Sequence, residues 1–179
     1  MATNLTIDDE LLVIVRDQQA RDREAVRALN ESAFGSSTEA DLVEALHRER
    51  AAVVALVAEM AGEVVGHILF SPVEVEISNG KRLSGLAPMA VAPPLQRRGI
   101  GSLLVREGLQ HCRDLGYDGV VLVGHAEYYP RFGFVPAHTL GLRCEYDVPP
   151  EVFMALELAD GSLGGVSGLV RYHGAFAQV

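Results

Sequence analysis

The side chains best suited to bind a charged ligand lie around one turn in the middle of the chain, where Arg97 and Arg98 stand among Gln96, Gly99 and Gly101. An apolar run precedes this turn and helically spaced apolar residues follow it, so the turn is expected to join a strand to a helix. The first amides of a helix lack acceptors within the helix, and the helix dipole adds partial positive charge there. Glycine lets an anion approach the backbone without meeting a Cβ. This turn is therefore predicted to bind phosphate.

Two better-known phosphate-binding turns do not fit this sequence. A Walker loop needs Gly-Lys-Ser/Thr, and that triplet does not occur. A dinucleotide fingerprint needs a third glycine, but Leu104 stands in its place, and the next apolar run, 119–124, ends without an acidic residue for a ribose. What remains is the pattern Gln-x-x-Gly-x-Gly. The alternative interpretation is an ordinary strand-to-helix turn whose glycines only relieve strain.

A second group of chemically capable side chains follows the next apolar run. His125 and Glu127 precede the pair Tyr128 and Tyr129, and Phe132 comes shortly after. Histidine and carboxylate accept protons, and a phenol can donate one, so the group could supply general acid and base catalysis. Each residue also has a structural interpretation. A lone histidine can cap a helix or bond a carbonyl, and the tyrosines can be packing residues.

The elements that must position these residues follow from hydrophobic periodicity and turn signals. Strands are expected at 11–15, 52–60, 63–70, 73–77, 83–91, 119–124, 152–158 and 168–172, and helices at 22–34, 38–46, 99–115 and 126–133. Asp22 is expected to cap the first helix and Phe34 to lie on its buried face. Asn79-Gly80 predicts a hairpin, and Pro88 a local departure from pairing. Several antiparallel strands are thus expected before the glycine turn and its helix. This order predicts a mixed sheet rather than a doubly wound one.

Size and charge limit the classes of protein that need to be considered. The chain has 179 residues, is 49% apolar and suits a single domain over residues 1–179. Its formal charge of −9 argues against a nucleic-acid partner. A polyanionic ligand would then need local positive charge, which Arg97 and Arg98 could supply, with Lys81 or Arg106 as further candidates.

Metal chemistry and membrane insertion are not indicated. The two cysteines, Cys112 and Cys144, have no metal-like spacing, the histidines are scattered, and Cys112 falls on an apolar helical stripe typical of a core residue. The N-terminus has no basic-then-apolar signal pattern, and no apolar run approaches membrane-spanning length. The sequence therefore predicts a cytoplasmic protein without a metal.

Two motifs that follow each other along the chain resemble the signature motifs of a known protein family. Tyr129-x-x-x-Gly133-Phe134 lies one strand after the helix that follows the Gln96-x-x-Gly99-x-Gly101 turn. Together they resemble the GNAT superfamily of acyltransferases, closely over residues 85–136 and elsewhere only in the order of elements. The resemblance implies an α+β fold with a mixed, mostly antiparallel central sheet flanked by helices. It also implies that the strand before the turn and the strand after the helix splay apart into an acyl-CoA cleft.

The resemblance further implies where acetyl-CoA, the co-substrate, would bind. Its diphosphate would lie on amides around the glycine turn, and its pantetheine arm would pair with strand backbone before that turn. The residues assigned to the cofactor are Met89, Ala90, Val91, Gln96, Arg97, Arg98, Gly99, Ile100, Gly101, Ser102, Tyr128 and Phe132. An asparagine that some relatives carry after the next strand is missing here, and Gly124-His125 stands in its region.

For catalysis, Tyr129 matches the general acid of the family, although Tyr128 beside it could exchange roles with it. Many relatives carry a glutamate base on the strand before the turn, but residues 83–89 contain no acidic residue. His125, Glu127 and a chain of water molecules are the candidates that remain. A backbone amide near residues 89–91 could stabilise the oxyanion.

The resulting prediction is an N-acetyltransferase that moves an acetyl group from acetyl-CoA to a primary amine, by direct attack of the amine on the thioester. The acceptor would be a small amine or a peptide terminus. The alternatives are a non-catalytic CoA-binding sensor domain and an O-acyl or longer-chain acyltransferase. The sequence leaves the oligomeric state open, a homodimer included.

Overall fold

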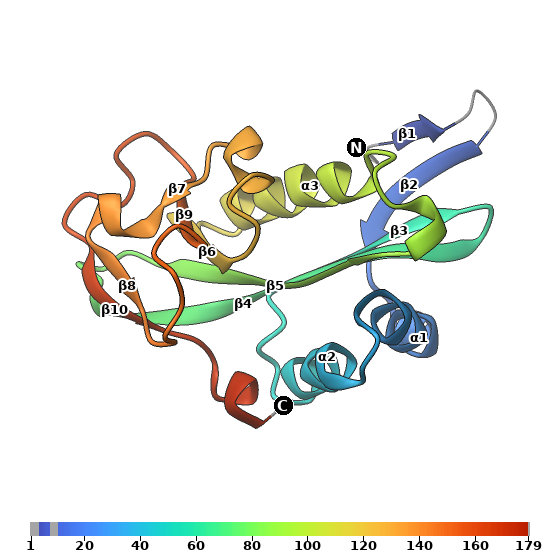
Figure 1. The fold of residues 1–179 in the computed structure, drawn as a ribbon, viewed down its shortest axis with the longest axis horizontal. Helices are drawn as coiled ribbons and strands as arrows, with labels where there is room; N and C mark the ends of the chain where they lie inside the picture. Colours follow the sequence, from blue (N-terminus) through green and yellow to red (C-terminus); the bar gives the residue numbers. More distant parts are fainter. Residues whose placement is uncertain (1–3, 8–10, 179) are drawn as a thin grey trace. The chain divides into compact units, whose positions relative to one another are not determined.

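Groups of strands and helices follow one another along the chain in the pattern of an α+β fold, as the computed structural model of residues 4–7 and 11–178 shows (Figure 1). The strands are β1 (Asn4–Ile7), β2 (Leu11–Asp17), β3 (Val54–Met60), β4 (Glu63–Ile77), β5 (Leu83–Val91), β6 (Gly119–Val123), β7 (Val135–Pro136), β8 (Leu142–Cys144), β9 (Phe153–Glu157) and β10 (Ser167–Arg171). The α-helices are α1 (Arg23–Phe34), α2 (Thr38–Arg48) and α3 (Ile100–Asp114). Short 3₁₀ segments are η1 (Ala20–Asp22), η2 (Pro93–Leu95), η3 (Tyr129–Phe132), η4 (Ala137–Leu140) and η5 (Gly174–Gln178).

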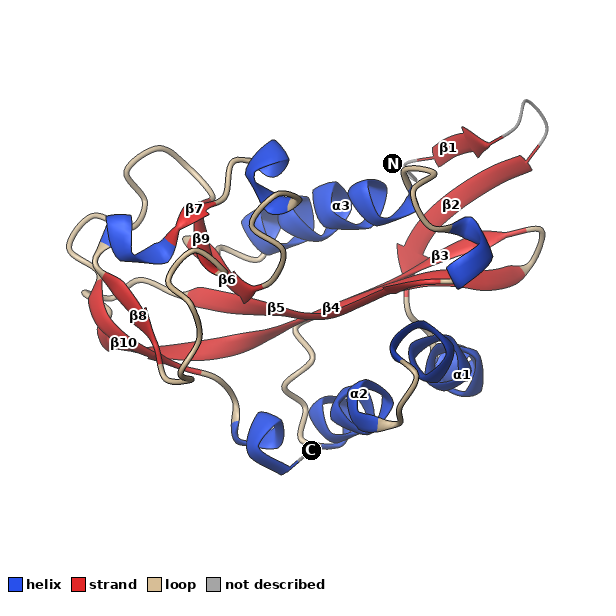
Figure 2. Ribbon diagram, viewed as in Figure 1, coloured by secondary structure: helices blue, strands red, loops and turns tan. Residues whose placement is uncertain are grey.

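The chain divides into two compact units that share three elements. The first unit comprises Met1–Phe70, Ala87–Gly108 and Ala175–Val179, and the second comprises Ser71–Leu86 and Leu109–Gly174. The long strands β4 and β5 and the helix α3 each contribute residues to both units (Figure 2). The expectation of one domain stays a prediction.

In the first unit the strands follow the order β1-β2-β3-β4-β5. The first four pair antiparallel, with Val13 opposite Met60 and Val54 opposite Phe70. Neighbouring residues of β4 point to opposite faces of the sheet, as a pleated strand requires. A Cβ on Gly66 would meet Leu104 of α3, whereas the His67 side chain meets Asn30 of α1. Helices α1 and α2 therefore cover one face and α3 covers the other (Figure 1).

Helices α1 and α2 form as the apolar spacing predicts, but two details differ. Val26, Leu42, Val43 and Leu46 are buried in one apolar cluster, and Gly35 ends α1 with a φ of 76°. Phe34, expected on the buried face, is 44% exposed. Asp22 does not cap α1 with its side chain. Its carboxylate is held instead by Arg16, six residues earlier on β2, in an ion pair that periodicity does not reveal.

In the second unit β6 lies between β5 and β9. It pairs parallel with β5 from Leu83 to Gly85 and antiparallel with the whole of β9. Strand β10 pairs antiparallel with β4 and parallel with β8. Val120, Val121 and Leu122 are completely buried, as their unbroken apolar run predicts. The sheet is therefore mixed and mostly antiparallel, which confirms the fold class.

Several element predictions are corrected in detail. The two strands expected at 63–70 and 73–77 form one strand, β4. The helix expected at 126–133 is the shorter 3₁₀ segment η3, which Gly133 ends with a φ of 97°. Strands β1, β7 and β8 were not expected, because they are only two to four residues long and carry too little periodicity to recognise. Pro88 lies inside β5, and its peptide bond with Ala87 is cis.

Candidate active site

The glycine turn lies between β5 and the start of α3, where the sequence predicts it. Gln96 folds back so that its Nε2 donates to the carbonyl of Val91 at 3.1 Å. Arg97 and Gly99 adopt positive φ angles of 63° and 91°. The carbonyl of Gly99 then accepts the amide of Leu103 at 3.0 Å, the first bond of the helix. The two left-handed residues turn the chain sharply into the helix, so that the first amides of α3 face out of its N-terminus.

The start of α3 is anchored by its apolar side. Ile100 and Leu104 are buried at 1% and 0% exposure and pack where Gly66 leaves room on β4. Arg97 and Arg98, by contrast, are exposed. The arrangement places two exposed basic side chains beside a helix end that is anchored by its apolar side, which suits a multiply charged anion.

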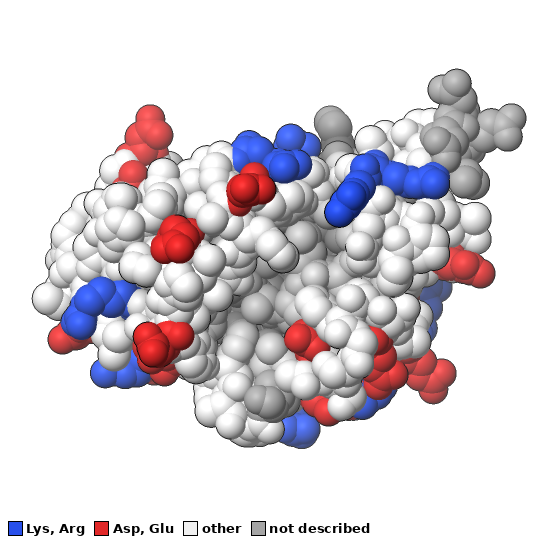
Figure 3. All heavy atoms as spheres, viewed as in Figure 1, with Lys and Arg blue, Asp and Glu red and all other residues white. Residues whose placement is uncertain are grey.

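On the face drawn in Figure 3, basic and acidic side chains occur in small separate groups with uncharged surface between them. That face therefore has no broad basic surface that would attract an anion.

The backbone that the resemblance assigns to pantetheine is the last part of β5. Ala90 is 3% exposed, whereas Met89 and Val91 are half-buried. In the second unit, the pairing recorded between β5 and β6 comprises three residue pairs and ends at Gly85 and Val121. Leu122 and Val123 of β6 continue to pair with β9 on the other side. The parallel pairing thus includes three of the nine residues of β5 and three of the five residues of β6.

Tyr129 is the first residue of η3 and is more buried than its neighbour Tyr128. It is 8% exposed, and burial raises its pKa to about 12, with a smaller contribution from Tyr128. The Tyr128 ring meets it edge-on at a centroid distance of 5.0 Å, and the Phe134 ring at 5.7 Å. The hydroxyl therefore stays protonated at neutral pH and can donate a hydrogen bond. Its enclosure among aromatic rings makes Tyr129, rather than the half-buried Tyr128, the candidate donor to a leaving group.

The two candidate bases lie in the turn between β6 and η3. His125 and Glu127 are both exposed to solvent. The carbonyl of His125 accepts the amide of Tyr128 at 3.0 Å, so His125 has a structural part in starting the turn through its backbone. Arg131 lies 4.5 Å above the Tyr128 ring and Phe132 packs against that ring at 5.4 Å. Tyr128 and Phe132 thus belong to one aromatic cluster with Tyr129.

The buried cysteine is not a nucleophile. Cys112 is completely buried on α3, 3.6 Å from the hydroxyl of Ser84, and burial raises the pKa of its thiol to about 11. A thiol with that pKa carries almost no thiolate at neutral pH. Cys112 is therefore a core residue, as its place on the helical stripe predicts.

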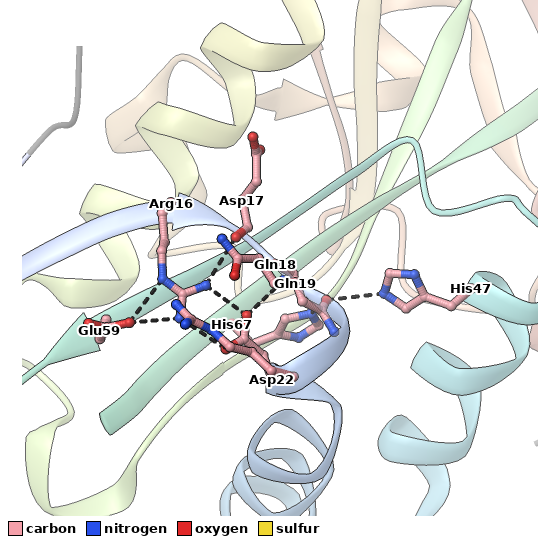
Figure 4. A network of polar contacts seen from close by, with 9 residues as sticks. Arg16, Asp17, Gln18, Gln19, Asp22, His47, Glu59 and His67 are labelled. Atoms are coloured by element: carbon pink, nitrogen blue, oxygen red, sulfur yellow. Dashed lines mark hydrogen bonds and ion pairs between the residues drawn. The ribbon is translucent and has the colours of Figure 1, made fainter. Parts of the chain in front are cut away.

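A polar network below the sheet was not found from the sequence (Figure 4). The Gln18 carboxamide oxygen accepts from Nε2 of His47 and from Nε2 of His67, each at 3.1 Å. Nδ2 of Asn30 donates to the carbonyl of Val26 at 2.9 Å and lies 3.4 Å from Nδ1 of His67. These residues come from α1, α2, β4 and the position directly after β2, so no sequence spacing brings them together. The network fits His67 as a neutral ring with hydrogen on Nε2 and a free lone pair on Nδ1 facing the Asn30 amide, while burial lowers the pKa of His47.

Two ion pairs of Arg16 in the same region tie β2 to Asp22 and to Glu59 of β3 (Figure 4). Arg16 donates to both carboxylate oxygens of Asp22, at 2.7 and 2.9 Å, and to Glu59 at 2.7 Å. The pKa of Asp22 is held below its usual value, chiefly by the hydrogen bonds from Arg16. These bonds hold the start of α1 against β2 and β3, so the role of Arg16 and Asp22 is structural.

His67 gives the protein a specific sensitivity to acid. It is completely buried, and desolvation lowers its pKa to about 3, so the folded state holds it neutral while the unfolded chain titrates near pH 6.5. As pH falls below 6.5, the unfolded state takes up the proton first. The contribution of the neutral His67 ring to the free energy of unfolding is therefore complete above pH 6.5. It is lost by about 1.4 kcal/mol per pH unit as the pH falls toward 3.

We expect His67→Gln, which cannot titrate, to remove this part of the pH dependence. Urea unfolding of both proteins at pH 7 and pH 5 measures it. The wild-type free energy of unfolding should fall by about 2 kcal/mol more than that of the variant over this interval. An equal loss in the two proteins would mean that the His67 ring titrates normally in the fold.

A cavity of about 560 Å³ opens between α1 and α2 near this network. Its apolar wall includes Val26, Ala40 and Val43, and its polar wall includes Gln18 and His47. The volume falls in the range of small-molecule sites. The cavity is a feature of the first unit alone and its lining carries none of the residues expected to act in catalysis.

Two further findings concern the described residues, 4–7 and 11–178. They contain no cluster of three or more histidine, cysteine, aspartate or glutamate side chains arranged to hold a metal ion. None of their helices combines the length and the apolar character needed to cross a membrane.

The fold and the two motif regions define a class of protein, and comparison with known proteins identifies the family. The family model of the acetyltransferase (GNAT) family matches residues 22–134. The N-acetyltransferase YhbS of Escherichia coli K12, described as uncharacterized, is 37% identical over 167 residues, which cover 92% of this chain and 98% of YhbS. The chain therefore belongs to the GNAT family and is an acyltransferase.

Solved structures agree with this assignment. The crystal structure of YhbS from Escherichia coli in complex with CoA has a TM-score of 0.88 and 36% identity, and the match covers 97% of this chain and 96% of that one. A GNAT acetyltransferase from Brucella melitensis in complex with acetyl-CoA has a TM-score of 0.75 and 34% identity, over 92% of this chain and 97% of that one.

Proposed function

We propose that this protein transfers the acetyl group of acetyl-CoA to a primary amine by direct attack of the amine on the thioester. The observation that carries the proposal is the turn into α3, where positive φ angles at Arg97 and Gly99 open the amides of the helix N-terminus beside two exposed arginines. The CoA and acetyl-CoA present in the two related crystal structures support acetyl-CoA as the donor.

In this proposal the diphosphate accepts hydrogen bonds from amides between Arg97 and Ser102. Gln96 stabilises the turn by its bond to Val91, because that bond fixes where the turn leaves β5. Arg97 and Arg98 neutralise phosphate charge. The half-buried backbone around Met89 and Val91 pairs with pantetheine and offers an amide to the oxyanion, while Tyr128 and Phe132 form an apolar wall for the cofactor.

The reaction conserves charge and protons in three steps. The neutral amine forms a bond to the thioester carbon, and the carbonyl oxygen becomes an oxyanion. The oxyanion then collapses, the bond between carbon and sulfur breaks, and the nitrogen loses a proton. The sulfur leaves as a thiolate and takes up a proton from solvent, which balances the proton that the nitrogen releases, so that a neutral amide and a neutral thiol result. Because the pKa of Tyr129 lies above that of a thiol, its hydroxyl acts mainly by donating a hydrogen bond to the sulfur as negative charge develops.

The base that accepts the amine proton is tested by His125→Ala. His125 and Glu127 are exposed, so water has direct access to the turn that carries them. We expect a loss in kcat/KM of less than about threefold and an unchanged pH–rate profile, because water can carry the proton to solvent. Loss of the acidic limb of that profile in His125→Ala, but not in Glu127→Gln, would make His125 the base.

The proposed function itself is tested by measuring release of free CoA thiol with a panel of amines, peptides with free N-termini and alcohols, with hydrolysis in their absence as control. Thiol release that depends on an amine, with the acetylated amine found by mass spectrometry, is the expected result. Binding of acetyl-CoA without turnover on any acceptor would favour a sensor domain. Turnover on alcohols alone would favour an O-acyltransferase.

A further inference from the structure

Gly124 is the residue directly after β6. The ring of Tyr129 fills the space into which a side chain at this position would point. An ideal Cβ built on Gly124 would lie 2.6 Å from Cε2 and 3.1 Å from Cδ2 of that ring, and 3.1 Å from Cδ1 of Leu122. The φ of Gly124 is not in the left-handed region. Backbone strain therefore does not require glycine here. The absence of a side chain matters because it leaves room for the ring.

Three contacts together fix the plane of that ring. Gly124 supports one edge, including the ε carbon next to the hydroxyl-bearing carbon. Tyr128 and Phe134 meet the ring edge-on, at interplanar angles of 88° and 71°. Gly124 is itself fixed by its amide, which donates to the carbonyl of Val152 at 2.9 Å. The ring therefore cannot shift away from a new Cβ without disturbing an aromatic neighbour.

We propose that Gly124 is a positioning residue for catalysis, which sets the direction of the Tyr129 hydroxyl by leaving space for its ring. This inference rests on the proposed role of Tyr129 as the hydrogen-bond donor to the leaving sulfur. The ring would have to move by roughly 1 Å to restore ordinary contact with a methyl group. Displacement of a catalytic group on that scale can cost about a hundredfold in rate.

The test is a double-mutant cycle of Gly124→Ala and Tyr129→Phe, with steady-state rates of thiol release. Gly124→Ala alone should lower kcat by roughly 10- to 100-fold and change KM for acetyl-CoA by less than about twofold. In the Tyr129→Phe background the same substitution should change kcat by less than about twofold, because phenylalanine has a ring but no hydroxyl to misplace. Gly174→Ala is the matched control, since a Cβ there meets no atom within 4 Å.

Several outcomes would overturn the inference. They are wild-type kcat in Gly124→Ala, an equal loss in both backgrounds, or a raised KM at unchanged kcat, which would make Gly124 a cofactor contact instead. If Gly124→Ala does not fold, Phe134→Leu replaces it in the cycle, because it removes a contact with the Tyr129 ring without adding volume. Its loss in kcat should again be much smaller in the Tyr129→Phe background than in the wild type. Wild-type kcat in Tyr129→Phe alone would instead refute the role proposed for Tyr129, so the two failures are distinguishable.

Discussion

Tyr129→Phe is expected to lower turnover by roughly 10- to 1000-fold, the range for loss of a group that donates a proton or hydrogen bond in the transition state. The substitution keeps the ring and therefore its edge contacts with Tyr128 and Phe134. Only the hydroxyl, which burial keeps protonated through a pKa of about 12, is removed. Because the ground-state contacts stay, the loss should appear in kcat, whereas the affinity for acetyl-CoA should stay near that of the wild type.

Tyr128→Phe is the matched control, since it removes a hydroxyl from the adjacent ring of the same cluster. We expect its kcat to stay within about threefold of the wild type, with calorimetric binding of CoA intact in both variants. A large loss in Tyr128→Phe with none in Tyr129→Phe would exchange the two roles. Full turnover in both would remove this cluster from the chemistry.

The second large effect is expected for Gly101→Glu, in the first turn of α3, which should abolish binding of CoA. A carboxylate about 4 Å from a phosphate oxygen costs about 4 kcal/mol near a protein surface, and the side chain also fills space next to the amides. That energy corresponds to a loss in affinity of roughly a thousandfold. Isothermal titration calorimetry with CoA measures it.

Gln110→Glu adds the same charge to the exposed side of the same helix, beyond its first turn, and should leave CoA affinity within about threefold of the wild type. Gly101→Ala adds a Cβ without charge and should fall between the two. Binding of CoA to Gly101→Glu at wild-type affinity would show that the diphosphate does not lie at this turn.

The sequence correctly predicted the elements whose hydrophobic periodicity or turn residues give a strong local signal. The unbroken run at Val120 to Leu122, the hairpin at Asn79-Gly80 and the helix from Ile100 all appear where periodicity and turn chemistry indicate. Glycine at the ends of α1, α3 and η3 adopts the left-handed conformation that a helix end needs. Local signals suffice for these elements because each is determined mainly by its own residues.

What the sequence missed depends on contacts between different elements. Asp22 resembles a helix cap, but Arg16 on β2 holds its carboxylate. The imidazole of His67 is neutral because it is completely buried, with Nε2 bonded to Gln18 and Nδ1 beside Asn30 of α1, and no spacing encodes this. The space that Gly124 leaves for Tyr129 is also visible only in three dimensions.

The most direct test of the proposed mechanism is a crystal structure of the protein with bound acetyl-CoA. We expect density for the diphosphate on the amides between Arg97 and Ser102, and the thioester sulfur within about 3.5 Å of the Tyr129 hydroxyl. A diphosphate bound elsewhere, or a thioester sulfur out of reach of that hydroxyl, would contradict the mechanism.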